Sequence, residues 1–404
     1  MLADRDTGEQ SPRRRKEDSH PGVLARYTAA AALARLADEG SRVALLLLAL
    51  ESGHGPAFGG LLIAALMVPH VVAAPVAGAL ADRVRRRRPL YVAGLLGFGL
   101  ALTGSALTVA VAPAAAFGCA VLAGCCAPLL IGGLTSLLGE LAPANLPRAY
   151  GLDASSYSVA GIAGPALAAV VAGTAGGVVA AAALAGACVL SAVLVTTLPV
   201  PDRGPDRTTR RRGTGRAVSA LWRRPVLGAV TAGTTLSHCG VGALPLLTAA
   251  LATRFGDTAF TGVALSVAAV GALISSLAYA RFPIRRWRPE HVVLAGLTAL
   301  GVPFALLVFL PGRWPALVLF AVAGLIEGPL FASLLTVRDR EAPPEVRTQV
   351  FTIAAGLKVT AAAAGAALAG LATGFGATAL LLGVAASQFV AGGVTAGLLR
   401  LRPR

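Results

Sequence analysis

Apolar segments of about 20 residues recur along the whole chain, separated by short polar breaks, and each is long enough to cross a bilayer as a helix. Only 13% of the 404 residues are charged, whereas roughly a quarter are charged in a typical soluble domain. Alanine and glycine are abundant in these segments and let helices pack closely in lipid. The sequence therefore predicts an all-α polytopic membrane protein.

The polar breaks predict twelve transmembrane helices. They cover residues 23–50, 58–80, 90–111, 114–138, 150–173, 177–198, 226–252, 258–281, 290–311, 315–337, 349–373 and 377–399. The longest internal break contains proline, glycine and eight arginines and separates two sets of six helices. We therefore predict four parts: a disordered cytoplasmic tail (1–22), an N-terminal six-helix bundle (23–198), a basic cytoplasmic linker (199–225) and a C-terminal six-helix bundle (226–404).

The distribution of the 35 basic residues predicts the orientation in the membrane. Thirty of them lie in the terminal segments and in every second break, and only Arg254 and Arg313 lie on the opposite side. The positive-inside rule then places both termini and the linker in the cytoplasm. Nearly all the basic residues are arginines, which fits a GC-rich bacterial genome and hence a bacterial cytoplasmic membrane. Anionic lipids are the expected partners of the cytoplasmic arginines.

The net charge of +16 does not indicate a nucleic-acid partner, because aromatic residues are few and do not alternate with the basic runs. The sequence contains no phosphate-binding glycine loop and no cysteine–histidine spacing typical of a metal site. We therefore expect no cofactor, no metal and no enzymatic activity. A monomer is the expected state.

The two halves are related by an internal repeat. The sequence RRRRPLYVAGL (85–95) matches RRWRPEHVVLAGL (285–297), and GCCAPLLIGGLTSLLGELAP (124–143) matches GLIEGPLFASLLTVRDREAPP (324–344). Repeated six-helix halves imply a pseudo-twofold axis along the membrane normal. This architecture is typical of transporters, whose binding site lies between the halves near the bilayer midplane.

The break after the second predicted helix reads GALADRVRRRRPL (78–90) and resembles the signature of the major facilitator superfamily, G-x-L-A-D-R-x-G-R-R/K. It departs at Arg85, where the family usually has glycine. The resemblance covers nearly the whole chain and implies alternating access between two rocking bundles. It also implies a conformational latch at the start of the eleventh helix. Its candidate residues are Gly78, Asp82, Arg83 and Arg86, with Arg347 as a local partner of Asp82.

The fifth predicted helix resembles the glycine motif of antiporters in this family. Gly151, Gly164 and Pro165 match the motif, and alanine occupies its three other positions. The match predicts tight helix packing and a proline bend, although a chance match in an Ala/Gly-rich helix is the alternative. The segment 114–138 lacks the arginine expected in proton antiporters, which argues against proton antiport.

Arg35, Asp38, Glu39 and Arg42 lie in the interior of the first predicted helix. Asp38 and Arg42 are four residues apart and share a face that Arg35 extends, whereas Glu39 points in another direction. We predict that arginine neutralises one acid while the other meets a cavity, as a proton or substrate site. An internal ion-pair network that only orients the helix is the alternative, as is a helix that starts later.

Glu327 lies inside the tenth predicted helix, next to Gly328 and Pro329. A buried carboxyl group can carry a proton, but pairing with Lys358 of the eleventh helix would keep it ionised. A structural hydrogen-bonding role is equally open. His238 of the seventh helix corresponds, through the repeat, to the region of Asp38 and Glu39 and is a further candidate for the cavity.

These patterns favour a secondary transporter with a small-molecule substrate. By resemblance to drug- and metabolite-efflux members from actinobacteria, we expect export of a hydrophobic or amphipathic compound, with proton antiport as an open possibility. An uptake permease for a polar solute is the main alternative. The low content of aromatic residues and amides in the helices argues mildly against it. A membrane sensor or an embedded enzyme is a weaker alternative.

Overall fold

A computed structural model of the protein describes residues 21–202, 215–257, 260–310, 312–372 and 375–401, and the regular structure in these ranges is entirely helical. The first half contains α1 (Pro21–Glu51), α2 (Gly55–Arg83), α3 (Arg87–Thr108), α4 (Pro113–Pro128), the π-helix η1 (Leu129–Gly133), α5 (Leu134–Ser136), α6 (Leu138–Leu141), the 3-10 helix η2 (Pro143–Asn145), α7 (Leu146–Ala175) and α8 (Gly177–Thr196). The second half contains α9 (Gly215–Arg223), α10 (Pro225–Phe255), α11 (Phe260–Arg281), α12 (Pro289–Phe309), α13 (Arg313–Glu341), the 3-10 helix η4 (Pro344–Val346), α14 (Arg347–Ala372) and α15 (Gly376–Leu401).

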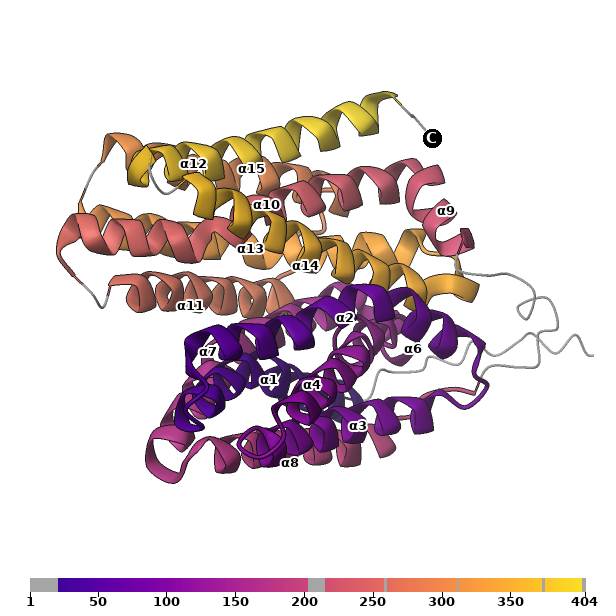
Figure 1. Cartoon of the computed structure of the whole chain (residues 1–404). Coiled ribbons are helices and arrows are strands. Elements are labelled where there is room, and N and C mark those ends of the chain that lie inside the picture. Colours follow the sequence, from indigo (N-terminus) through magenta and orange to yellow (C-terminus); the bar gives the residue numbers. More distant parts are fainter. Residues whose placement is uncertain (1–20, 203–214, 258–259, 311, 373–374, 402–404) are drawn as a thin grey trace, which may run out of the picture.

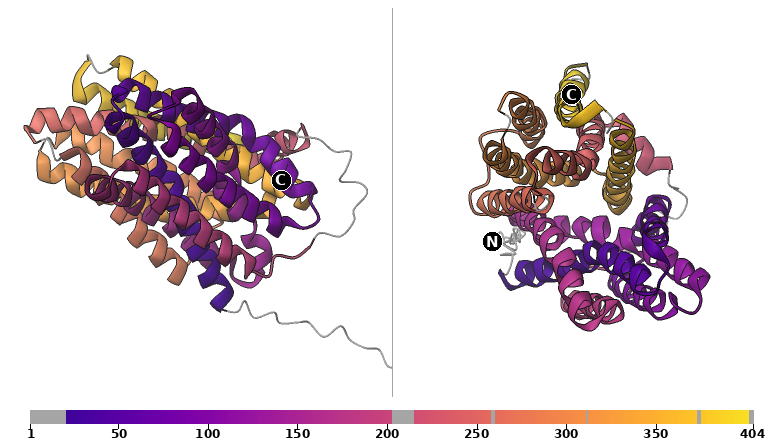
Figure 2. Two further views of the ribbon diagram at one scale, coloured as in Figure 1. Left: turned by 60° about the horizontal axis from the view of Figure 1, so that its bottom comes forward. Right: turned by 60° about the vertical axis from the view of Figure 1, so that its left-hand side comes forward.

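The long helices form two bundles that lie side by side, α1–α8 in one and α10–α15 in the other (Figures 1 and 2). The bundles meet where α2 packs against α14 and where α7 packs against α11 and α13. Helix α9, the first element of the second half, lies at the same end of the molecule as the end of α15 (Figure 1). A binding site shared by the halves therefore has to lie between the α2–α14 contact and the contacts of α7 with α11 and α13.

Ten helical elements within the described ranges are long and apolar enough to span a membrane, and the bent helix α2 is an eleventh candidate. The bend in α2 amounts to 42° and lies between Pro69 and Pro75, each of which removes a backbone hydrogen bond. Helix α1 has 31 residues, about 46 Å, so it exceeds a bilayer core in length. The charged residues in its interior set α1 apart from the more apolar helices.

The predicted linker differs from the structure in one respect, because α9 forms within it. Ala217 and Leu221, four residues apart, share a helical face that packs against Leu227 and Val350. Residues 203–214 of the linker, and the predicted tail except residues 21 and 22 at the start of α1, lie outside the described residues. The four-part division of the chain stays a prediction.

Glycines allow α7 to approach its neighbouring helices closely. A Cβ atom at Gly164 of α7 would lie 2.7 Å from the backbone oxygen of Leu36, and one at Gly40 of α1 would lie 2.8 Å from the oxygen of Gly164. Gly151 serves the contact between bundles, because its Cβ would lie 2.8 Å from the Cα of Ala280 in α11. Pro165 lies inside α7, which continues through it. These contacts agree with the tight packing predicted for this helix.

We expect Gly164→Ala to lower the free energy of unfolding by about 1–3 kcal/mol, because the added methyl group meets backbone atoms of α1 that cannot move aside. Gly173→Ala in the same helix is the matched control, since nothing lies within 4 Å of its Cβ position. Thermal unfolding of both variants in detergent measures the difference. Equal stability of the two would show that α1 and α7 can separate without cost.

Candidate functional site

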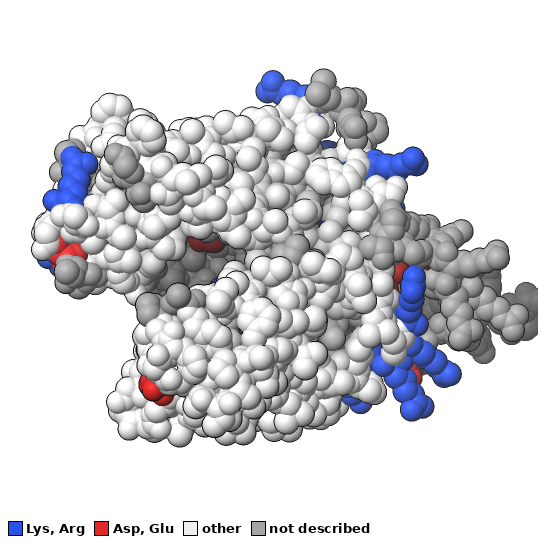
Figure 3. Space-filling view, in the orientation of Figure 1, with Lys and Arg blue, Asp and Glu red and all other residues white. Residues whose placement is uncertain are grey.

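A cavity of about 310 Å³ lies between the two bundles. Figure 3 shows the surface hollowed between the halves, in the part of the molecule away from most of the Lys and Arg. The lining comes from both bundles, through α7 on one side and α10–α14 on the other: Ala154, Tyr157, Ser158, Gly161, Thr234, Ser237, His238, Val241, Ala269, Ala272, Ser276, Leu297, Leu300, Glu327, Gly328, Leu330, Phe331, Leu334 and Lys358. The volume is in the range of small-molecule sites, roughly 300–1,000 Å³.

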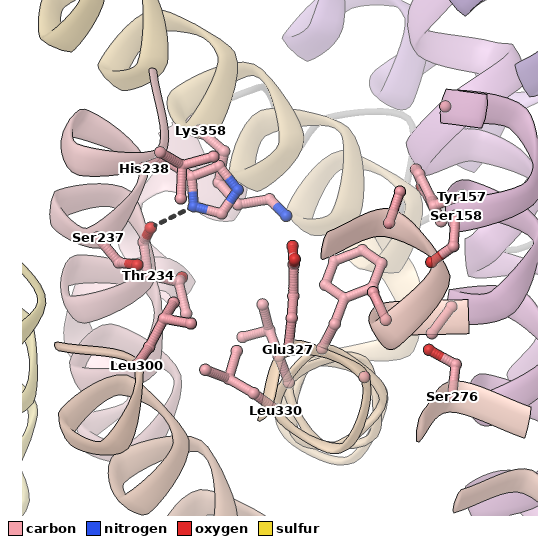
Figure 4. Close-up of a pocket in the computed structure, with 18 of the residues that line it drawn as sticks. Tyr157, Ser158, Thr234, Ser237, His238, Ser276, Leu300, Glu327, Leu330 and Lys358 are labelled. Atoms are coloured by element: carbon pink, nitrogen blue, oxygen red, sulfur yellow. Dashed lines mark hydrogen bonds between the residues drawn. The ribbon is translucent and has the colours of Figure 1, made fainter. Parts of the chain in front are cut away.

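Three of the sequence-predicted candidates meet in this cavity: Glu327, Lys358 and His238. Each lies near the middle of its helix, α13, α14 and α10 respectively, so the site lies at mid-depth of the bundles. The carboxyl group of Glu327 and the amine of Lys358 point toward one another (Figure 4). Nevertheless, among the described residues no salt bridge joins them, and the Lys358 Nζ atom lies 4.3 Å from the centre of the Phe331 ring. His238 Nδ1 lies 2.8 Å from the Thr234 carbonyl oxygen.

The wall contributed by the first bundle leads to a buried polar network around Arg35. The Arg35 guanidinium lies 3.6 Å from the centre of the Tyr157 ring, which lines the cavity. Its Nη2 atom forms a salt bridge of 2.8 Å with Asp153, and the side chains are 2% and 0% exposed. Thr135 Oγ1 accepts from Arg35, 2.8 Å, and Tyr27 donates its hydroxyl to Asp153, 2.6 Å. The network joins α1, α5 and α7.

The α1 charges differ from the predicted arrangement, in which one acid is neutralised by arginine and the other meets a cavity. Arg35 does not extend the face of Asp38 but reaches across to Asp153 on α7. Arg42 forms ion pairs with both acids, because its Nη2 atom lies 3.0 Å from Asp38 and its Nη1 atom lies 2.8 Å from Glu39. One guanidinium can serve acids three and four residues away because both lie on the preceding helical turn. None of these four residues lines the central cavity.

The end of the molecule that carries most of the arginines is closed by contacts between α2 and α14. Asp82, 4% exposed, accepts hydrogen bonds from the backbone N–H groups of Thr348, 3.1 Å, and Gln349, 2.9 Å. These are free N–H groups in the first turn of α14, where the helix dipole favours an anion. A Cβ at Gly78 would lie 2.6 Å from the Cα of Gln349, so a side chain there would separate the two helices.

Other candidates for the latch have different surroundings. Arg347 forms an ion pair with Asp339, 3.4 Å, in the same bundle. Arg83 and Arg86 are exposed, and Arg86 lies 4.0 Å from Asp202. The neighbouring Arg87 is buried instead and pairs with Glu140. The geometry at this end thus centres on Asp82 and the start of α14.

Two functional candidates were missed in the sequence. Asp153 lies at the start of a predicted helix, so the rule that an ionisable residue inside a span needs a partner would have found it. Arg338 was counted among the basic residues of a loop, but it lies inside α13 and is 2% exposed. Helix α13 ends at Glu341, four residues beyond the predicted end at 337. Hydropathy therefore placed Arg338 outside the helix and did not mark it as an ionisable residue inside a span.

Residues 27–366 match the sequence family Major Facilitator Superfamily. The multidrug efflux pump Tap of Mycobacterium tuberculosis is 30% identical over 84% of this chain and 84% of its own length. The transporter y4rN of Sinorhizobium fredii is 27% identical over 87% and 88%. Among solved structures, a bacterial homologue of the iron transporter ferroportin in an outward-facing state has a TM-score of 0.75, with 14% identity over 94% of this chain and 99% of that chain. The fucose:proton symporter FucP of E. coli has a TM-score of 0.72, with 15% identity over 94% and 99%.

Proposed function

Because the chain belongs to the major facilitator superfamily, and the similar proteins named above are transporters and not enzymes, we propose that it exports small amphipathic compounds by alternating access. The observation that carries the proposal is the central cavity, which takes its walls from both bundles and combines leucine and phenylalanine side chains with a few polar groups. The similarity to multidrug efflux pumps named Tap supports the direction of transport and the class of substrate.

In this proposal the arginine-rich end faces the cytoplasm, so the cavity opens outward. The alternation of basic residues along the chain supports this orientation in a bacterial cytoplasmic membrane. Anionic lipids would then bind the exposed arginines, and the protein would act as a monomer. Export would require the halves to separate at the arginine-rich end and to close around the cavity at the other.

Glu327 is the residue that we propose for proton coupling. It is exposed to the cavity, whereas Asp38 and Glu39 are both held by Arg42. A carboxyl group that is free to change its charge state in a shared cavity can link proton release to substrate binding. The proposed latch consists of Asp82, Gly78 and the first turn of α14.

Transport into inside-out vesicles with an acidic interior tests the export function. A panel of labelled amphipathic compounds should include at least one that accumulates in vesicles with the protein and is released by a protonophore. Vesicles with Gly78→Leu, in which α2 and α14 are held apart, provide an inactive control. Uptake in the opposite direction, or accumulation of polar sugars alone, would contradict export and favour a permease.

We expect Asp82→Asn to open the arginine-rich end, because the neutral amide loses the charge that attracts the N–H groups of α14, worth about 1–3 kcal/mol. Ser136 reports on this opening, since its hydroxyl lies 3.2 Å from Thr348 across the contact and it is 1% exposed. In a background without other cysteines, Ser136→Cys should react faster with a water-soluble maleimide when Asp82 is replaced. Asp202→Asn, an exposed site at the same end, is the control. Unchanged labelling in Asp82→Asn would contradict the latch.

A further inference from the structure

We infer that the cavity takes compounds that carry an anionic group beside an apolar body, with Arg338 and Lys358 as the cations that hold this group. The inference rests on the proposed export function and narrows its substrate class. It starts from Arg338, whose side chain is 2% exposed. Its Nε and Nη2 atoms have no hydrogen-bond partner among the described residues. A buried cation without a counter-ion destabilises the fold, so the protein retains Arg338 at a disadvantage in stability.

Arg338 does not line the cavity itself but lies one helical turn beyond a residue that does. Leu334 lines the cavity, and Arg338 follows it by one helical turn on the same face of α13. Side chains on a helix lean toward its N-terminus, which for Arg338 means toward Leu334. Lys358, the second cation of the proposed site, lines the same cavity from α14.

The charges in this space and next to it do not balance. The described lining holds one amine, Lys358, and one carboxylate, Glu327, and the unpaired Arg338 lies one helical turn from it. Asp153, the nearest acid of the first bundle, already holds Arg35 through a salt bridge of 2.8 Å. The cavity therefore retains one excess positive charge when Glu327 is ionised and two when it is protonated. A ligand carboxylate, sulfonate or phosphate would supply the missing negative charge. It would also accept hydrogen bonds from the unpaired N–H groups of Arg338.

The remaining walls fit an apolar body. Leu297, Leu300, Leu330 and Phe331 face the same space from α12 and α13. A volume of about 310 Å³ admits one or two fused rings with a short charged arm. Serine and threonine hydroxyls between these walls offer additional hydrogen bonds without a fixed charge.

Binding to the purified full chain in nanodiscs tests the inference with three probes that share a naphthyl body: naphthylacetate, the uncharged naphthylacetamide and the cationic naphthylethylamine. We expect naphthylacetate to bind about tenfold more tightly than the amide, since a hydrogen bond to a charged group contributes about 1.5 kcal/mol. Arg338→Gln and Lys358→Gln should each remove this preference. Glu327→Gln should keep or increase it. Arg313→Gln is the control, because Arg313 pairs with Asp257 outside the cavity.

A thermal melt separates a ligand-binding role of Arg338 from a structural one. Removal of an unpaired buried charge should leave the melting temperature of Arg338→Gln equal or higher, whereas loss of a structural arginine would lower it. Equal binding of the three probes, tighter binding of the amine, or no binding of naphthylacetate at millimolar concentration overturns the inference. Vesicle transport keeps the two proposals apart. Export without a preference for anions refutes only this inference, and absence of any export refutes the proposed function.

Discussion

Asp153→Asn will lower the free energy of unfolding by about 3–5 kcal/mol, because it leaves Arg35 charged in the protein interior without its counter-ion. Both side chains of the pair are inaccessible, 2% and 0% exposed, so water cannot replace the lost carboxylate. The carboxylate also accepts the hydroxyl of Tyr27, 2.6 Å, and that of Thr135, 3.1 Å. The variant therefore weakens the contacts of α1 and α5 with α7 at one point.

Two companion variants make this result specific. Asp153→Asn combined with Arg35→Gln removes both charges and should recover most of the stability, because a buried pair contributes little in net terms once both members are gone. Glu39→Gln removes half of a second arginine pair in α1, but its side chains are 32% exposed. That substitution should cost less than about 1 kcal/mol. Thermal unfolding in detergent compares the three, and equal loss in Asp153→Asn and Glu39→Gln would mean that the buried network does not hold α1.

The helices and their order could be predicted from the sequence because each depends on local hydropathy. The contact of Asp82 with the start of α14 could be expected as well. The sequence signature that contains Asp82 also contains the small Gly78, which lets α14 approach. Side-chain partners across the bundle could not. The spacing within α1 placed Arg35 on the face of Asp38 and Arg42, but its partner in the structure is Asp153, 118 residues away in the chain. Spacing along one helix carries no information about a neighbour that packs against it.

Arg338 is a second residue whose surroundings could not be predicted from the sequence. Arg338 is one of the basic residues on which the predicted orientation of the chain rests. The remaining basic residues give the same orientation without it. Its burial depends on where α13 ends and on what packs around its last turns, and neither follows from hydropathy. In contrast, His238, Glu327 and Lys358 were found from the cost of placing ionisable groups inside a span, and they share one cavity.

Glu327→Gln will remove the dependence of export on the proton gradient while leaving the chain folded. Glutamine has nearly the shape of glutamate but cannot release a proton, so a proton no longer has to leave when the substrate enters the cavity. A gradient of about one pH unit supplies about 1.4 kcal/mol per proton, enough for about tenfold accumulation of substrate. Inside-out vesicles with an acidic interior should reach that level with the wild-type protein. With Glu327→Gln they should only equilibrate the substrate, with no response to a protonophore.

Glu51→Gln is the matched control for this measurement. Glu51 lies at the end of α1, where its carboxylate accepts the backbone N–H of Gly177, 2.8 Å, outside the cavity. Its replacement should leave gradient-driven accumulation intact. Asp38→Asn and Glu39→Gln should also retain it, because Arg42 forms ion pairs with both acids and neither lines the cavity. If Glu327→Gln still accumulates substrate tenfold while Asp38→Asn does not, the coupling acid lies in α1 and not in the central cavity.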